Sequence, residues 1–210
     1  GFQRAIADDP RYATSYQWFA DMLGGQGRVN ERLKQLIRAR ELDPLSRIFG
    51  NDIAQTLFVL GKIDEAIAQI EQTLALDPAF APGYKTLGLL YVRKGRREEG
   101  IQLLRRSLEL SGRRPIEVGH LARIYGWLGQ RDSSLSLLRE LEDRAKREYI
   151  PGFALALAQM GQGNTDRAFS LLNHGLDERE PSLIENWFDP ALESLHSDPR
   201  WKLFLSRLGI

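Results

Sequence analysis

Five glycines at a constant spacing constrain this chain more than any other feature of its sequence. They stand 34 residues apart, at Gly27, Gly61, Gly95, Gly129 and Gly163. Each follows one apolar stretch and precedes another, where a residue with left-handed backbone ends a helix and a side chain is unfavourable. Because only 19 of the 210 residues are glycine, five in one phase indicate a structural unit that repeats along the chain.

Three further columns of residues keep the same period. Seven residues before each glycine stands a small residue: Ala20, Ala54, Gly88, Ala122 and Ala156. The residue before that is large and apolar: Phe19, Ile53, Leu87, Leu121 and Leu155. Nine residues after each glycine stands another apolar column: Leu36, Ile70, Leu104, Leu138 and Leu172. Apolar residues recur at steps of three and four, so the sequence predicts pairs of amphipathic helices that cross at the small residues.

The repeated unit resembles the tetratricopeptide repeat (TPR). The resemblance rests on the 34-residue length, the small and large columns, and three Asp-Pro pairs that end second helices. It is clearest in YKTLGLLY (residues 84–91) and DEAIAQIEQTLALDP (residues 64–78), and it covers roughly residues 1–179. It implies an all-α, right-handed superhelical solenoid of antiparallel helix pairs with a C-terminal helical cap.

Four positions depart from the TPR pattern. Arg32 stands where alanine is usual, and Gln159 replaces an aromatic residue. Gly112 and Lys146 stand where a proline is expected. These departures loosen the later repeats without breaking the period.

The resemblance also sets the expected organisation of the chain. Residues 1–12 should form the second helix of a truncated upstream repeat, because Phe2, Ala5 and Pro10 fall on second-helix columns. A lone half-repeat would expose an apolar face, so we expect the chain to be part of a longer protein. Residues 13–180 should form five TPR-like pairs, at 13–46, 47–80, 81–114, 115–148 and 149–180.

Residues 181–210 leave the period. Asp198 and Pro199 predict the start of a helix, and the apolar stripe of that helix is Trp201, Phe204, Leu205 and Leu208. We expect this tail to cover the fifth repeat as a set of capping helices. It resembles the ending of bacterial TPR proteins whose repeats follow a winged-helix DNA-binding, cyclase or protein-kinase domain. That resemblance implies the C-terminal part of a larger bacterial protein.

The sequence offers no constellation for catalysis or for holding a metal or cofactor. The chain has no cysteine, and its histidines, His120, His174 and His196, lie in different units. The run at residues 24–27 lacks the preceding strand and the Gly-Lys-Ser/Thr ending of a phosphate loop, so it is a turn between helices. We therefore predict no enzyme activity, no metal and no cofactor. No apolar run approaches the roughly 20 residues of a membrane span, and we expect a cytoplasmic location without membrane insertion.

By resemblance, a TPR solenoid offers a concave surface lined by the first helix of each pair. The expected partner-binding residues are Gln17, Asp21, Asn51, Asp52, Gln55, Phe58, Lys85, Leu89, Arg93, His120, Arg123, Trp127, Phe153 and Leu157. TPR domains that hold a Glu-Glu-Val-Asp-type carboxylate use lysine, asparagine and arginine, which only Asn51, Lys85 and Arg123 match. Asp21 and Asp52 would repel such a ligand, so no chaperone-tail function is assigned. Solvation of a curved surface explains each single residue equally well.

Charge is balanced over the whole chain but uneven along it. Lysine and arginine number 29 against 28 acidic residues, a formal net charge of +1. The third repeat is rich in bases: Lys85, Arg93, Lys94, Arg96, Arg97, Arg105, Arg106, Arg113 and Arg114. The end of the fifth repeat and the tail are acidic: Asp177, Glu178, Glu180, Glu185, Asp189, Glu193 and Asp198. The basic patch can attract an acidic partner, solvated helix surface explains it as well, and the two patches can pair molecules head to tail.

The predicted function is a protein–protein interaction scaffold that binds a peptide or a partner domain. The alternative is the regulatory or sensor region of a transcription regulator or signalling enzyme, where the repeats bind a small effector. Repeats that read nucleotides show recurring polar pairs at fixed phases. The column of Gln17, Asn51, Lys85, Gly119 and Phe153 shows no such recurrence, which argues against nucleic acid as the partner.

Overall fold

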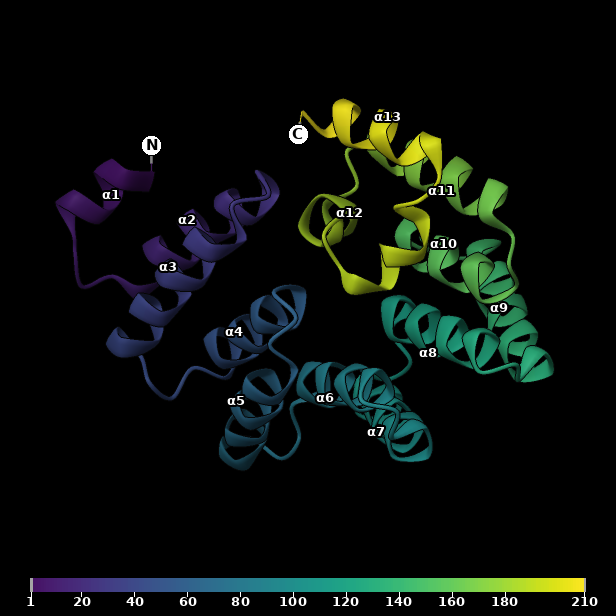
Figure 1. Cartoon of the computed structure of the whole chain (residues 1–210), viewed down its shortest axis with the longest axis horizontal. Helices are drawn as coiled ribbons and strands as arrows, with labels where there is room; N and C mark the ends of the chain where they lie inside the picture. The colour runs from purple at the N-terminus through teal and green to yellow at the C-terminus, as the bar shows by residue number, and fades with distance from the viewer. Residues whose placement is uncertain (1, 210) are drawn as a thin grey trace. The chain divides into compact units, whose positions relative to one another are not determined.

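The structure is a computed structural model that describes residues 2–209. The side chains of Phe2, Gln3, Ile184 and Glu185 lie outside the described residues, and so do the expectations for Phe2 and Glu185. Between residues 2 and 209 the chain forms helices and connecting turns without a strand, which confirms the predicted all-α fold (Figure 1). It divides into two compact units, Gly1–Leu103 (unit 1) and Leu104–Ile210 (unit 2), with the boundary inside one helix.

Unit 1 consists of helices that pack in sequence order. They are α1 (Phe2–Asp8), α2 (Ala13–Gly25), α3 (Val29–Leu42), α4 (Arg47–Val59), α5 (Ile63–Leu76), α6 (Ala81–Arg93) and the first half of α7 (Arg97–Leu110). The helices α2 and α3 lie side by side, as do α4 and α5, and each second helix contacts the first helix of the next pair. We call α2, α4 and α6 the first helices of unit 1.

Unit 2 continues the same pattern and ends in a tail of short helices. Its elements after α7 are α8 (Pro115–Trp127), α9 (Arg131–Ala145), α10 (Gly152–Gly161), α11 (Thr165–Asp177), α12 (Pro181–Asn186), the 3₁₀ helix η1 (Pro190–Leu195) and α13 (Pro199–Leu208). The first helices of unit 2 are α8 and α10, which pack against α9 and α11 respectively. The tail contacts α10 through α12 and contacts α11 through both α12 and α13.

The glycine column has the backbone that its spacing predicts. All five glycines have a positive φ, between 72° at Gly27 and 84° at Gly95. A Cβ added at Gly61, Gly95, Gly129 or Gly163 would meet no atom within 4 Å. Backbone conformation, and not lack of space, therefore selects glycine in this column.

Helix crossings are close where small residues were expected. Ala20 and Ala54 in unit 1 and Ala122 and Ala156 in unit 2 are all fully buried. A Cβ added at Gly100 on α7 would lie 2.8 Å from the carbonyl oxygen of Gly88 on α6. The small columns therefore let neighbouring helices meet through backbone atoms.

Each unit has its own apolar core. In unit 1, Leu36, Ile53 and Ile70 belong to a cluster between α2 and α6, and Ile6 of α1 packs against a smaller cluster with Tyr16 and Phe49. In unit 2, one cluster joins α10 and α11 to the tail. The tail is thus part of the core of unit 2 and not an appendage to it.

The helix predicted at the end of the tail is present. Asp198 precedes α13, and its side chain accepts a hydrogen bond from the Arg200 backbone N–H at 2.9 Å, with Pro199 in the first position. Hydrogen bonds from Arg200 also hold the pKa of the Asp198 carboxyl down, at about 2. Trp201 and Phe204 on this helix are buried, and Leu205 and Leu208 are partly buried against the same cluster, so the predicted helix start and apolar stripe are present.

Candidate partner-binding face

The expected binding residues of unit 1 are joined by hydrogen bonds from one first helix to the next. Gln17 Nε2 on α2 donates to Asp52 Oδ2 on α4 at 3.1 Å. Thr86 Oγ1 on α6 donates to Asn51 Oδ1 on α4 at 2.8 Å, and Gln55 Nε2 donates to Thr86 Oγ1 at 3.4 Å. The structure therefore brings Gln17, Asn51, Asp52 and Gln55 together into one polar row, which we call the unit 1 face.

A buried arginine lies beneath this row. Arg32 is only 5% exposed, although alanine is usual at its position in the repeat. Its Nε donates to Thr56 Oγ1 at 3.1 Å, and its guanidinium lies 3.6 Å from Asp21 Oδ1. The long side chain of Arg32 thus reaches from α3 to both α2 and α4, and it supports the face from below.

Two carboxyl groups share this one guanidinium. Burial raises the pKa of Asp52 to about 6, although the charge of Arg32 acts in the opposite direction, and the nearby Asp21 charge raises the pKa further. Burial also raises the pKa of Asp21, and Arg32 again opposes the shift. The unit 1 face therefore carries more negative than positive charge when both carboxyls are ionised, and one of them titrates near pH 6.

Four other expected residues of unit 1 differ in their exposure. Phe58 is half-buried and packs against the core of the unit. Lys85 and Leu89 on α6 are 9% and 7% exposed. Arg93 is exposed at the end of α6. The expectation that Asn51, Lys85 and Leu89 line an open surface is corrected, because Asn51 is only 6% exposed and all three side chains are packed away from solvent.

An exposed aromatic pair beside the unit 1 face was missed in the sequence. Trp18 is 50% exposed and Tyr12 is 48% exposed, and their rings meet edge to face with centroids 6.4 Å apart. Trp18 lies one turn before Asp21 on α2. Its position in the repeat is the sequence feature that indicates it. The equivalent positions of the next two repeats are the polar residues Asp52 and Thr86, so a tryptophan is unusual there.

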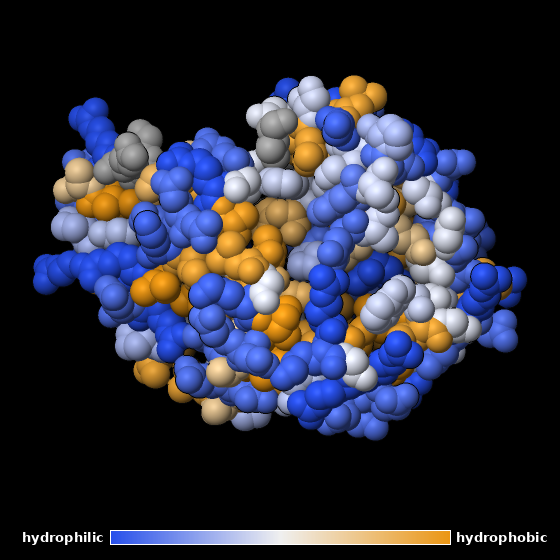
Figure 2. All heavy atoms as spheres, viewed as in Figure 1, coloured by the Kyte–Doolittle hydropathy of each residue, from blue (hydrophilic) through white to orange (hydrophobic). Residues whose placement is uncertain are grey.

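A second exposed apolar area of unit 1 lies on α3, on the turn after it and at the start of α4. Figure 2 shows apolar side chains reaching the surface over α3, with polar side chains around them. Ile37 on α3 is 45% exposed, and Leu45 and Ile48 in the following turn and helix are 73% and 50% exposed. None of these residues was predicted as a binding residue.

In unit 2 the expected binding residues are mostly covered. His120, Phe153 and Leu157 are fully buried. Phe153 and Leu157 belong to the same cluster as Leu183 and Trp187 of the tail, which packs on α10. The expectation that these three residues face a partner is corrected, because the tail of the chain already occupies their face.

The remaining two residues of unit 2 stay closer to solvent. Arg123 on α8 is half-buried, and its Nε is enclosed by protein. Trp127, at the end of the same helix, is 60% exposed. Arg123 and Trp127 are therefore more exposed to solvent than His120, Phe153 and Leu157 are.

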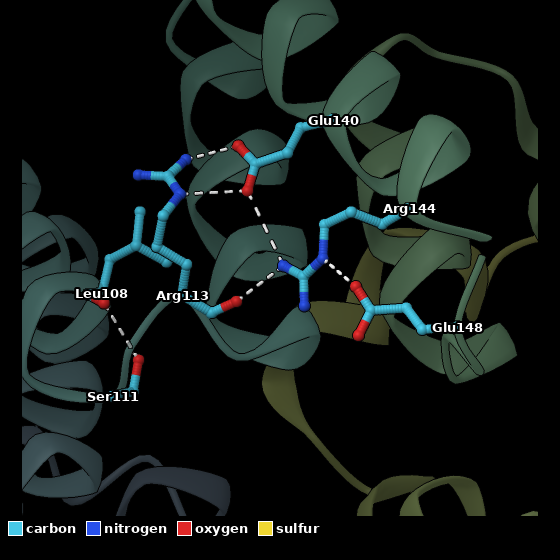
Figure 3. A network of polar contacts seen from close by, with 6 residues as sticks. All are labelled: Leu108, Ser111, Arg113, Glu140, Arg144 and Glu148. Carbon is cyan, nitrogen blue, oxygen red and sulfur yellow. Dashed lines mark hydrogen bonds and ion pairs between the residues drawn. The ribbon is translucent and has the colours of Figure 1, made fainter. Parts of the chain in front are cut away.

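The basic residues of the third repeat are largely neutralised by nearby acids. Lys94 pairs with Asp64 at 2.6 Å, and Arg96 pairs with Glu99 at 2.5 Å. Around the turn after α7, Arg113 pairs with Glu140, and Arg144 bridges Glu140, Glu148 and the Arg113 carbonyl (Figure 3). Exposed pairs of this kind contribute only about 0–1 kcal/mol each. A functional basic patch and head-to-tail pairing of the two patches stay predictions.

The part of the chain that the structure describes contains no metal cluster and no membrane helix. No three His, Cys, Asp or Glu side chains among the described residues are placed to hold a metal ion. Within residues 2–209, no helix combines the length and the apolar composition that crossing a membrane requires.

Stacked antiparallel helix pairs with residues joined across their first helices define an α-helical repeat protein. Residues 81–113 match the family model described as tetratricopeptide repeat, so this part of the chain is a tetratricopeptide repeat. A search of curated proteins finds no match.

Solved structures share the fold. The thermophilic TPR protein TTC0263 of Thermus thermophilus is 21% identical with a TM-score of 0.63, covering 94% of this chain and all of that one. PilW, a type IV pilus biogenesis factor, is 17% identical with a TM-score of 0.64, covering 92% of this chain and 87% of that one. YrrB, a TPR protein with an unusual peptide-binding site, is 18% identical with a TM-score of 0.51, covering 88% of this chain and 95% of that one.

Proposed function

We propose that this chain is a protein-interaction module that binds a polypeptide segment on the unit 1 face. The observation that carries the proposal is the polar row across α2, α4 and α6, where side chains about one repeat apart hydrogen-bond to one another. Such cross-helix bonds hold polar groups in fixed positions, which lowers the entropy lost when a ligand binds. The similarity to a TPR protein with a peptide-binding site supports a peptide as the ligand.

The charge of the unit 1 face selects the chemistry of the partner. Asp21 and Asp52 share only Arg32, so an ionised pair leaves one negative charge without a matching cation in that group. A lysine or arginine of the partner supplies the missing charge, and the exposed ring of Trp18 offers a surface for its aliphatic stem or its cation. A partner ending in acidic residues would meet repulsion here. The proposed ligand is therefore a basic segment of a protein.

The rest of the predicted function is consistent with this proposal. Repeats of this family act in general as scaffolds, and we propose that this chain is non-catalytic. We propose further that it works as part of a larger bacterial protein in the cytoplasm. The alternative of a small effector as ligand is not favoured by any observation on the described residues.

Selection from a random peptide library tests the proposal directly. We expect the full chain to enrich peptides that contain lysine or arginine. An enriched peptide should bind the Asp21→Asn/Asp52→Asn chain about tenfold more weakly in fluorescence anisotropy. Each of the two substitutions keeps the shape of the side chain and removes its negative charge. Glu65→Gln on α5 is the matched control, an exposed carboxylate paired with Lys62 outside the face. Enrichment of acidic peptides, or equal binding by the Asp variants, would contradict the proposal.

A further inference from the structure

The beginning of the tail is anchored to α10 in the way a bound peptide would be. Glu180 is 4% exposed, and its carboxylate accepts hydrogen bonds from the backbone N–H groups of Gly152 at 2.6 Å and Phe153 at 3.1 Å. These N–H groups begin α10 and have no partner within the helix, so a carboxylate there satisfies them and complements the helix dipole. In Figure 1, α12 lies on the side of α10 that faces away from α9.

The segment is anchored a second time nine residues later, on α8. Asp189 Oδ2 lies 3.5 Å from His120 Nε2, an ion pair when the histidine is protonated. The other oxygen of Asp189 accepts from the Ala191 backbone N–H at 2.7 Å and starts η1. Between the two anchors, Leu183 is fully buried and Trp187 is 9% exposed, in the cluster that contains Phe153 and Leu157. Residues 180–189 thus carry two carboxylate anchors and two apolar anchors on the first helices of unit 2.

One feature of this attachment is unfavourable. The indole N–H of Trp187 is enclosed without an acceptor among the described residues, so it loses its hydration without compensation. This feature is not needed by the repeats themselves. This penalty disappears when the segment leaves the face.

We infer that the first helices α8 and α10 form a second binding site, which the chain's own residues 180–195 close. The ligand that fits is a polypeptide segment with a carboxylate, an aliphatic anchor, an aromatic anchor and a second carboxylate at the spacing of Glu180, Leu183, Trp187 and Asp189. A partner segment of this chemistry displaces the chain's own segment and binds in its place. The site is separate from the unit 1 face, where the proposed ligand is basic.

The probe for this inference is a fluorescently labelled peptide with the sequence of residues 179–196 of this chain. It is titrated against the unaltered full chain and against Leu183→Ala/Trp187→Ala, which loosens the attached segment and leaves α8 and α10 unchanged. We expect the loosened chain to bind the peptide at least tenfold more tightly than the unaltered chain does.

Two controls keep the result interpretable. A peptide with Glu180→Gln and Asp189→Asn should lose most of its affinity, and the Asp21→Asn/Asp52→Asn chain should bind as its parent does, so the two sites fail independently. If the loosened chain keeps its circular dichroism spectrum and does not bind the peptide, the inference is wrong. Hydrogen exchange of the unaltered chain gives a second test. Amides of residues 181–195 should exchange before those of α10 and α11, and exchange of all three as one unit would overturn the inference.

Discussion

The two units carry the same helical frame and present different first helices. In unit 1, polar side chains of α2, α4 and α6 hydrogen-bond across the helices beside an exposed tryptophan. In unit 2, the counterparts on α8 and α10 are a buried histidine and buried apolar residues under the tail. The glycine and alanine columns are alike in both units, so they set the frame and leave the surface to the residues between them.

The difference shows how a repeat protein can divide its tasks along the chain. Each repeat contacts only its neighbours, so a change in one stretch does not require a change in another. In our proposal unit 1 uses its polar face to bind a partner, whereas unit 2 uses its face to hold the tail. On this view, the stability of unit 2 depends on the tail and that of unit 1 does not.

Removing one ring from the tail should produce the largest effect. Phe204 is fully buried, and its ring stacks on that of Trp201 with centroids 5.1 Å apart. Phe204→Ala should lower the free energy of unfolding of unit 2 by about 3–5 kcal/mol. Leu203→Ala, 64% exposed on the same helix, should change it by less than about 0.5 kcal/mol. Urea unfolding measures the size of the loss, and hydrogen exchange shows where it occurs. An equal loss of protection in unit 1 would contradict the statement that only unit 2 depends on the tail.

A smaller loss is expected where α8 and α10 meet. A Cβ at Gly119 would lie 2.5 Å from the carbonyl oxygen of Ala154, and backbone cannot yield as a side-chain tip does. Gly119→Ala should therefore destabilise unit 2 by about 1–3 kcal/mol. Gly25→Ala on α2 in unit 1 is the control, because an added Cβ there meets nothing within 4 Å and alanine favours the helix. The melting temperature should fall for the first variant and hold or rise for the second.

The frame was predictable from the sequence because it depends on local rules. A left-handed turn needs glycine, a close crossing needs a small residue, and both recur with the period. The face was less predictable because the same phase has different surroundings in each repeat. Gln17, Asn51 and Lys85 share their phase with Gly119, which touches backbone, and with Phe153, which lies beneath the tail. The tail has no period, so the sequence predicted that it covers the fifth repeat without showing that it buries expected binding residues.

The stability of unit 1 should depend on pH, because the pKa of the Asp52 carboxyl on the unit 1 face is raised to about 6. Burial raises the pKa of Asp52 from 3.8 to about 6, so the folded state holds the proton more tightly than the unfolded state. The resulting stabilisation is complete below pH 3.8 and is lost as the pH rises through about 6. Asp52→Asn should therefore be the more stable protein at pH 8, by about 1 kcal/mol after allowance for partial exposure, and should lose that advantage at pH 4.

Thermal melts at the two pH values measure this difference. Asp64→Asn, which removes an exposed carboxylate on α5, should not reproduce the pattern. If Asp52→Asn changes the melting temperature equally at pH 4 and pH 8, ionisation of Asp52 does not destabilise the folded protein. The unit 1 face would then be an ordinary solvated surface, and the carboxyl groups would no longer distinguish it from the first helices of unit 2.

The smallest effect concerns how the two units end their second helices. In unit 1, α3 and α5 end at Asp-Pro pairs, whereas α7 ends in unit 2 with Gly112 and Arg113 at φ values of 63° and 60°. The Arg113 side chain pairs with Glu140, and its carbonyl accepts from Arg144 at 2.7 Å (Figure 3). Arg113→Ala and Arg113→Gly both lose the exposed ion pair, worth about 0–1 kcal/mol, but only glycine removes the backbone strain. The glycine variant should therefore be more stable than the alanine variant by about 1 kcal/mol in urea unfolding. Equal stabilities would mean that this turn is as relaxed as the Asp-Pro turns of unit 1, although it lacks their proline.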